Sequence, residues 1–318
     1  MPSPTPLLKS LSRPLLLLAA GGLALLAASL VLMLVDPRQL MGASVWLKPA
    51  KFAASIAAAT ATLALLLRHI HLPAAGGRRA TAVIVVTAVL ELAIITLQAA
   101  RGVPSHFNAT SPLNVALFSA MGIGISMFTV AVAYVTWHAF RQRFADRALG
   151  WGIRLGLVTM LVGSAIAFVM PRPTPDQLHS MRAGHAPAMV GAHAVGVADG
   201  GPGLPVTRWS TEGGDLRVPH FIGIHALQLL PLVGWRLGRR GRGSAAGAAR
   251  AARMTVVAGA GMIGLVAVTL VQALRGIPAL APDAPTVALA LAVVAGCTLA
   301  AVWPARACAA ALPTGAGA

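Results

Sequence analysis

Three histidines of this chain, in two separate segments, could carry chemistry. His106 lies in the polar run 105–108, whereas His220 and His225 share one apolar stretch near Gln228. Neutral imidazoles in that number suit haem, copper or zinc. His220 and His225 are five residues apart, or about 140° round a helix, so only tertiary folding could bring the three together. The alternatives are therefore a haem or transition-metal site formed by His106, His220 and His225, or separate hydrogen-bonded histidines within a core.

A second polar group surrounds Glu91, the one acidic residue predicted inside a membrane-length apolar run. A charge at that depth is costly, so such residues usually face the interior of a bundle. Gln98 shares the face of Glu91, and Arg101 follows about 15 Å from Glu91 along a helix axis, too far for a direct pair. We predict that Glu91, Gln98, Asn108 and Gln228 bind a ligand. The alternative is a protonated Glu91 that serves packing.

A seven-residue pattern occurs twice at an offset of 174. Residues 98–104 read Gln-Ala-Ala-Arg-Gly-Val-Pro, and residues 272–278 read Gln-Ala-Leu-Arg-Gly-Ile-Pro. The recurrence indicates a duplicated unit in which Arg101 and Arg275 are equivalent. One alternative is purely structural, because Gly permits a left-handed helix end, Arg suits the helix dipole and Pro stops the helix. The other is a pair of guanidiniums that face one outer cavity and bind a small anion such as a carboxylate, a phosphate or a haem propionate.

The elements that must position these residues are long apolar helices. Hydrophobic residues make up 57% of the chain and charged residues only 10%, which is too little charge for a soluble domain. The runs are near the length that a helix needs to cross a bilayer, and they do not alternate as strands do. The sequence therefore predicts an all-α polytopic membrane helix bundle with a lipid bilayer as its partner. Its eight helices are expected at 15–35, 48–68, 80–101, 113–139, 151–170, 218–237, 252–274 and 285–305.

The duplication divides the predicted bundle into two parallel four-helix units, residues 1–147 and 148–318. The net charge of +17 does not indicate nucleic-acid binding, because the basic residues lie between apolar runs rather than on one polar face. Arginines concentrate in alternate short loops, and the positive-inside rule then places both termini in the cytoplasm. The segment 171–217 becomes an extracytoplasmic loop. We expect most of it to be flexible and solvated, with 209–215 able to fold over the outer mouth of the bundle.

Small residues indicate close helix contacts. Residues 259–264 match the dinucleotide-binding pattern GxGxxG, but they lie within a predicted helix with no strand before it, so a role in helix packing is expected instead. Gly152 and Gly156 are expected to act in the same way.

Segments 46–49, 101–108 and 214–225 resemble an uncharacterised group of bacterial multi-pass membrane proteins, to which no activity is attached. The resemblance spans most of the chain and implies only a membrane location, which we expect to be the bacterial inner membrane. Three functions stay open: a protein that binds a small ligand, metal or haem, a transporter of a small anionic solute, and a non-catalytic membrane assembly factor. The sequence does not decide whether the protein is an enzyme, nor its oligomeric state.

Overall fold

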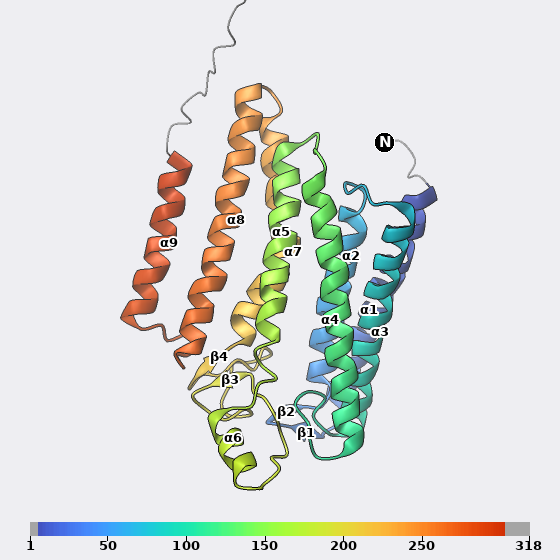
Figure 1. Ribbon diagram of the computed structural model, residues 1–318, viewed down its shortest axis with the longest axis vertical. Coiled ribbons are helices and arrows are strands. Elements are labelled where there is room, and N and C mark those ends of the chain that lie inside the picture. Colours follow the sequence, from blue (N-terminus) through green and yellow to red (C-terminus); the bar gives the residue numbers. More distant parts are fainter. Residues whose placement is uncertain (1–5, 303–318) are drawn as a thin grey trace, which may run out of the picture.

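The computed structural model describes residues 6–302, and it confirms an all-α polytopic helix bundle (Figure 1). Eight of its helices are long and apolar enough to cross a membrane. They are α1 (Pro6–Val35), α2 (Leu47–Leu66), α3 (Ala74–Ala100), α4 (Pro112–Arg141), α5 (Arg147–Ala167), α7 (Arg217–Gly241), α8 (Ala245–Leu274) and α9 (Ala284–Val302). The ninth described helix, α6 (Pro175–Arg182), is a short helix in the long loop.

Several helices begin earlier than the sequence predicts. Helix α1 starts at Pro6 rather than at 15, α3 at Ala74 rather than at 80, and α8 at Ala245 rather than at 252. Long basic side chains bury their stems and keep their charge in water, so a helix can continue past the apolar run that defines its span. The predicted end of the last helix, 303–305, lies outside the described residues.

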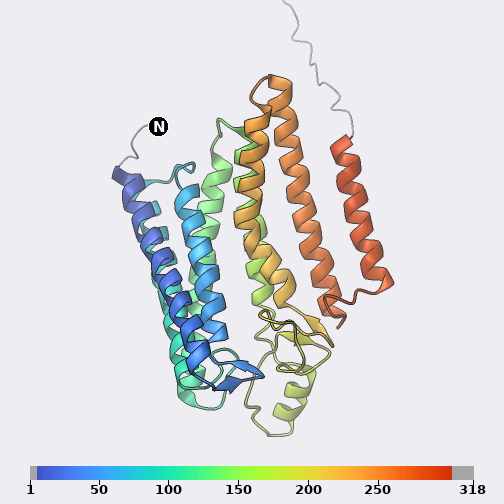
Figure 2. The same cartoon turned by 180° about the vertical axis from the view of Figure 1, so that it is seen from behind.

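The helices run alternately up and down, so the start of α1 and the end of α9 lie at the same end of the bundle (Figures 1 and 2). Helix α2 packs on α1, α3 contacts both, and α4 packs on α3. In the second half α7 packs on α5, α8 contacts both, and α9 packs on α8. Contacts of α2 with α7 and of α4 with α5 join the two halves. We call the end with the strands and α6 the loop-rich end, and the other the arginine-rich end.

Glycines allow α5 and α7 to cross at very short range. A Cβ atom on Gly152 or Gly163 would lie less than 3 Å from backbone atoms of α7, and one on Gly223 would lie 2.5 Å from the Cα of Gly163. No side chain fits between these backbones. The expected packing role of Gly152 and Gly156 is thus confirmed, and Gly259 likewise lies against a side chain of α5.

The segment 171–217 contains more regular structure than the sequence predicts. Besides α6 it contains β3 (Ala194–Val195), which pairs antiparallel with β4 (Gly214–Asp215). In the first half, β1 (Gln39–Leu40) and β2 (Ala43–Ser44) form a hairpin. Its two turn residues, Met41 and Gly42, both have positive φ, as a two-residue type I′ turn requires.

The ordered loop connects the two halves of the bundle. The amide of Ala109 donates to the carbonyl of Ala188 at 2.9 Å, and the amide of Val190 donates to the carbonyl of Phe107 at 2.8 Å. The ammonium of Lys51 donates to the carbonyl of Thr207 at 3.1 Å. Backbone groups of the loop therefore find hydrogen-bond partners in the first half. These contacts hold the loop against the bundle.

Candidate functional site

Five titratable side chains gather at the loop-rich end, where α2, α3 and the long loop meet. We call them the loop-end cluster: Lys48, Glu91, His106, His193 and Asp199. Lys48 comes from the first turn of α2 and Glu91 from the interior of α3. His106 lies between α3 and α4, and the last two lie in the long loop. The cluster therefore forms only when both halves of the chain are folded.

His106 is held between a carboxylate and a set of aromatic rings. Its Nε2 lies 3.7 Å from Oε1 of Glu91, and its side chain is only 20% exposed. Its Nδ1 lies 3.1 Å from the hydroxyl of Ser105, and the rings of Phe52 and Phe118 each lie 5.8 Å from the imidazole. Burial lowers the pKa of His106 well below its ordinary value, and the charge of nearby Lys48 lowers it further. The imidazole is therefore neutral at pH 7.

His193 forms a second pair of imidazole and carboxylate. Its Nδ1 lies 2.7 Å from Oδ2 of Asp199, and the same carboxylate accepts the backbone amides of His193 and Ala194. Burial alone raises the pKa of Asp199, but the hydrogen bonds from His193 and these amides bring it down to about 2. The hydrogen bond at Nδ1 orients the ring and leaves Nε2 available, an arrangement that proteins use to position a base or a ligand.

Phe107 lies between the two histidines. Its ring centroid is 4.8 Å from that of His193 and 6.1 Å from that of His106. The residue is buried and has a φ of 62°, a conformation that costs a bulky residue on the order of 1–3 kcal/mol. The adjacent amide contacts between the loop and residues 107–109 maintain this conformation and therefore the spacing of the two imidazoles.

Lys48 is the charged residue of the cluster with the fewest direct polar contacts. Its ammonium lies 5.9 Å from the ring centroid of Phe52, and among the described residues it makes no hydrogen bond and no ion pair. Lys51, one turn further along α2, donates to a backbone carbonyl. A half-buried ammonium has three donors to satisfy, so Lys48 is the side chain of the cluster best suited to bind a negatively charged group.

The structure does not bring His106, His220 and His225 together as a ligand set. Nδ1 of His220 pairs with the carbonyl of Gly163 at 2.8 Å. His225 contacts the side chain of Gln228 at 3.3 Å and that of Ser55 at 3.5 Å. Within residues 6–302 no three His, Cys, Asp or Glu side chains are grouped so as to hold a metal ion. The metal-ligand prediction therefore gains no support from this arrangement.

Arg101 and Arg275 lie at the ends of α3 and α8, which are on opposite sides of the bundle (Figures 1 and 2). Both side chains are exposed. Arg101 donates to Gln98 and Asn114, and Arg275 pairs with Asp283. The structure thus does not place the two guanidiniums around a common cavity.

The two repeated corners nevertheless share one backbone geometry. In each, the amide two residues after Arg donates to the carbonyl of the Gln, at 3.0 Å in the first corner and 3.1 Å in the second. The glycines have φ values of 70° and 74°, as a left-handed helix end requires. The Gln side chain donates to the carbonyl of the Pro in both corners, at 3.4 and 2.7 Å. Gln98 therefore supports a corner, and so does Asn108, whose amide donates to Pro104.

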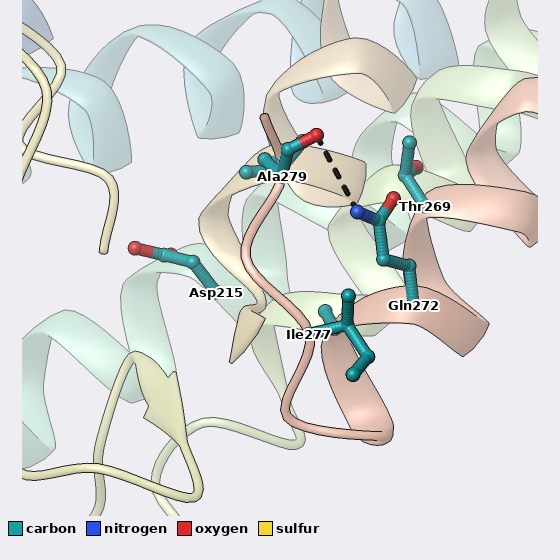
Figure 3. A pocket seen from close by; sticks show the side chains of 7 residues that line it. Asp215, Thr269, Gln272, Ile277 and Ala279 are labelled. Atoms are coloured by element: carbon teal, nitrogen blue, oxygen red, sulfur yellow. Dashed lines mark hydrogen bonds between the residues drawn. The ribbon is translucent and has the colours of Figure 1, made fainter. Parts of the chain in front are cut away.

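A small pocket lies beside the second corner. Figure 3 shows Gln272 directed at the carbonyl of Ala279, with Thr269, Ile277 and Asp215 around it. The pocket has no room for a molecule of the size of water. It is therefore a packing gap between α8 and the following turn rather than a ligand site.

Sequence reasoning missed the part of the site that lies in the long loop. Glycines and prolines around His193 carry no periodic signal, and only the presence of Asp199 six residues later could have indicated a pair. Lys48 carries no distinct signal either, because Lys beside Trp is also typical of an interfacial anchor at a membrane boundary.

The fold and this cluster together define a multi-pass membrane helix bundle. One end of it holds imidazoles, carboxylates and an ammonium that has no direct acceptor among the described residues. Comparison of the chain with protein-family models, curated proteins and solved structures finds no match. The function is therefore argued from the geometry of the site.

Proposed function

We propose that this protein binds a small anionic ligand at the loop-end cluster, with the ammonium of Lys48 as the principal charge contact. The neutral imidazoles of His106 and His193 supply further hydrogen-bonding groups. The aromatic rings around His106 exclude water from one side of the site, and an ion pair is stronger where water is excluded.

The observation that carries this proposal is the state of Lys48. Basic groups nearby already have acceptors, since Arg217 pairs with Asp215 and Lys51 donates to Thr207. Lys48 has no such acceptor among the described residues, although it is half-buried. A half-buried donor without a partner destabilises the protein, and an anionic ligand would provide the missing acceptor.

The test is a binding screen on the purified protein in lipid nanodiscs. Thermal unfolding is recorded with phosphate, sulfate, acetate and succinate at constant ionic strength, with chloride as the baseline. We expect at least one of these anions to raise Tm, because a ligand that binds only the folded state stabilises it. Lys48→Met should abolish this increase. Lys51→Met, which removes a charge one turn away, should leave it in place even if its own baseline Tm is lower.

Two results would contradict the proposal. One is the failure of every anion to raise Tm above the chloride baseline. The other is an equal loss of the increase in Lys48→Met and Lys51→Met, which would indicate general attraction by positive charge rather than a contact at Lys48.

A transport function is favoured by a different observation, the polar contacts between α2 and α7. Ser55 contacts His225, which in turn contacts Gln228. The buried Nε2 of Gln228 has no hydrogen-bond partner within the described part of the chain. These groups lie where the two halves meet, further from the loop-rich end than Lys48. If the ligand passes along them, proteoliposomes should accumulate the anion found in the binding screen. Gln228→Leu should then reduce uptake without reducing the increase in Tm.

We also propose that the two halves are duplicated units, that the protein lies in a bacterial inner membrane, and that both termini are cytoplasmic. The common geometry of the two corners supports the duplication. The clustering of arginines at one end supports the orientation, because short cytoplasmic loops carry an excess of Lys and Arg.

A further inference from the structure

A groove between α1 and α3 lies at the arginine-rich end, far from the loop-end cluster. Its volume is about 360 Å³ and its lining residues are Pro14, Arg78, Thr81, Ala82, Val85 and Val86. That volume is within the range of small-molecule sites, about 300–1,000 Å³. Arg78, Ala82 and Val86 are exposed on the outside of the bundle, so the groove opens toward the lipid and not toward the interior.

The polar and apolar parts of the groove are separated along the helix axis. Arg78 is the fifth residue of α3, so it lies about 6 Å from the start of the helix, whereas Val86 lies about 18 Å from it. Arg78 is thus near the boundary of the membrane, and Val85 and Val86 are at the depth of the acyl chains. A groove with a cation at its mouth and an apolar floor matches the shape and chemistry of a phospholipid.

The charge at the mouth of the groove is positive and uncompensated. Arg78 is exposed and has no hydrogen bond or ion pair with any residue in the range that the structure describes. The acidic residue at this end, Asp146, caps the start of α5 and lies 4.0 Å from Arg242. The next residue, Arg79, is also basic and exposed, although it does not line the groove. The groove therefore attracts a negatively charged headgroup.

We propose that this groove binds one anionic phospholipid from the leaflet at the arginine-rich end, with the phosphate at Arg78 and an acyl chain along Ala82, Val85 and Val86. The inference is independent of the ligand proposed for the loop-end cluster.

The test compares lipid retention by native mass spectrometry. Protein in mixed micelles receives equal amounts of phosphatidylglycerol and phosphatidylcholine. We expect one retained phosphatidylglycerol per chain. Arg78→Gln should weaken its binding about fivefold, since a basic residue at the membrane surface contributes on the order of 1 kcal/mol to attraction of anionic lipid.

Two further variants distinguish lipid binding in the groove from general attraction by positive charge. Arg79→Gln removes the same charge from the next residue, which does not line the groove, and should weaken retention much less. Ala82→Phe fills the groove from its lipid-facing side while it keeps Arg78, and should displace the lipid. Because Ala82 is exposed, the elution profile of this variant in size-exclusion chromatography should match that of the parent protein.

The proposal is overturned if phosphatidylglycerol is not preferred to phosphatidylcholine, or if Arg79→Gln and Arg78→Gln have equal effects. It is also overturned if Ala82→Phe retains the lipid, or if free glycerol phosphate displaces it at similar concentrations, since either result would mean that the acyl chain makes no contribution.

Discussion

At the scale of single residues, the burial of His106 predicts that the stability of the protein depends on pH. The pKa of this imidazole is lowered by burial and by the charges of Lys48 and His193, so the folded protein keeps His106 neutral. An unfolded chain takes up a proton near pH 6.5. Between the lowered pKa of the folded state and the ordinary pKa of the unfolded chain, the unfolded state binds more protons than the folded state. The free energy of unfolding therefore decreases as the pH falls.

We expect the Tm of the detergent-solubilised protein to be highest above pH 7 and to decrease as the pH falls from 6.5 to 5. For one histidine that does not titrate in the folded state, the loss at pH 5 is about 2 kcal/mol. His106→Gln, which cannot be protonated, should make the decrease smaller. Part of it should persist, because burial also lowers the pKa of His193. An unchanged pH dependence in His106→Gln would contradict this explanation.

At the scale of elements, the crossing of α5 and α7 is the contact most sensitive to small changes of volume. The same substitution should have opposite effects at two glycines. Gly163→Ala places a Cβ 2.7 Å from the backbone nitrogen of Ile224, and such overpacking costs about 1–3 kcal/mol or more. Gly122→Ala on α4 places a Cβ where no heavy atom of residues 6–302 lies within 4 Å, and it should stabilise the helix slightly.

The measurement is the Tm of both variants in the same detergent, with the fraction of protein that elutes as a single species. Gly163→Ala should lower both values, and Gly122→Ala should lower neither. Equal Tm values for the two variants would show that α5 and α7 can separate without loss of stability, and that their close crossing is not required.

The number and approximate positions of the long helices could be predicted from the sequence because the thickness of a bilayer fixes the length of each apolar run. The two corners could also be predicted, because Gly102 and Pro104 specify a local backbone geometry. The loop-end cluster could not. Glu91 and His106 meet only through the fold of the chain, and the order of the loop around His193 depends on hydrogen bonds to residues far away in sequence.

At the scale of the whole molecule, the sidedness of the bundle can be tested by cysteine labelling. In a variant that lacks the native cysteines Cys297 and Cys308, a single cysteine is placed at the exposed positions Ala186 or Gly243. If the loop-rich end faces outward, a membrane-impermeant maleimide should label Ala186→Cys in intact cells. Gly243→Cys should react only after the cells are permeabilised. The reverse pattern would invert the proposed orientation and place the loop-end cluster in the cytoplasm.

The pairing of residues 107–109 with 188–190 has a consequence for biosynthesis. Residues 107–109 leave the ribosome before residues 188–190 have been made, and roughly 80 residues separate the two segments. At about 5–20 residues per second, the delay is on the order of 4–16 s. During that interval the backbone amides near Phe107 have no partner from the second half, and the left-handed conformation of this residue is not yet enforced. The spacing of the two imidazoles that flank Phe107 is therefore set late in synthesis, after the loop has been made.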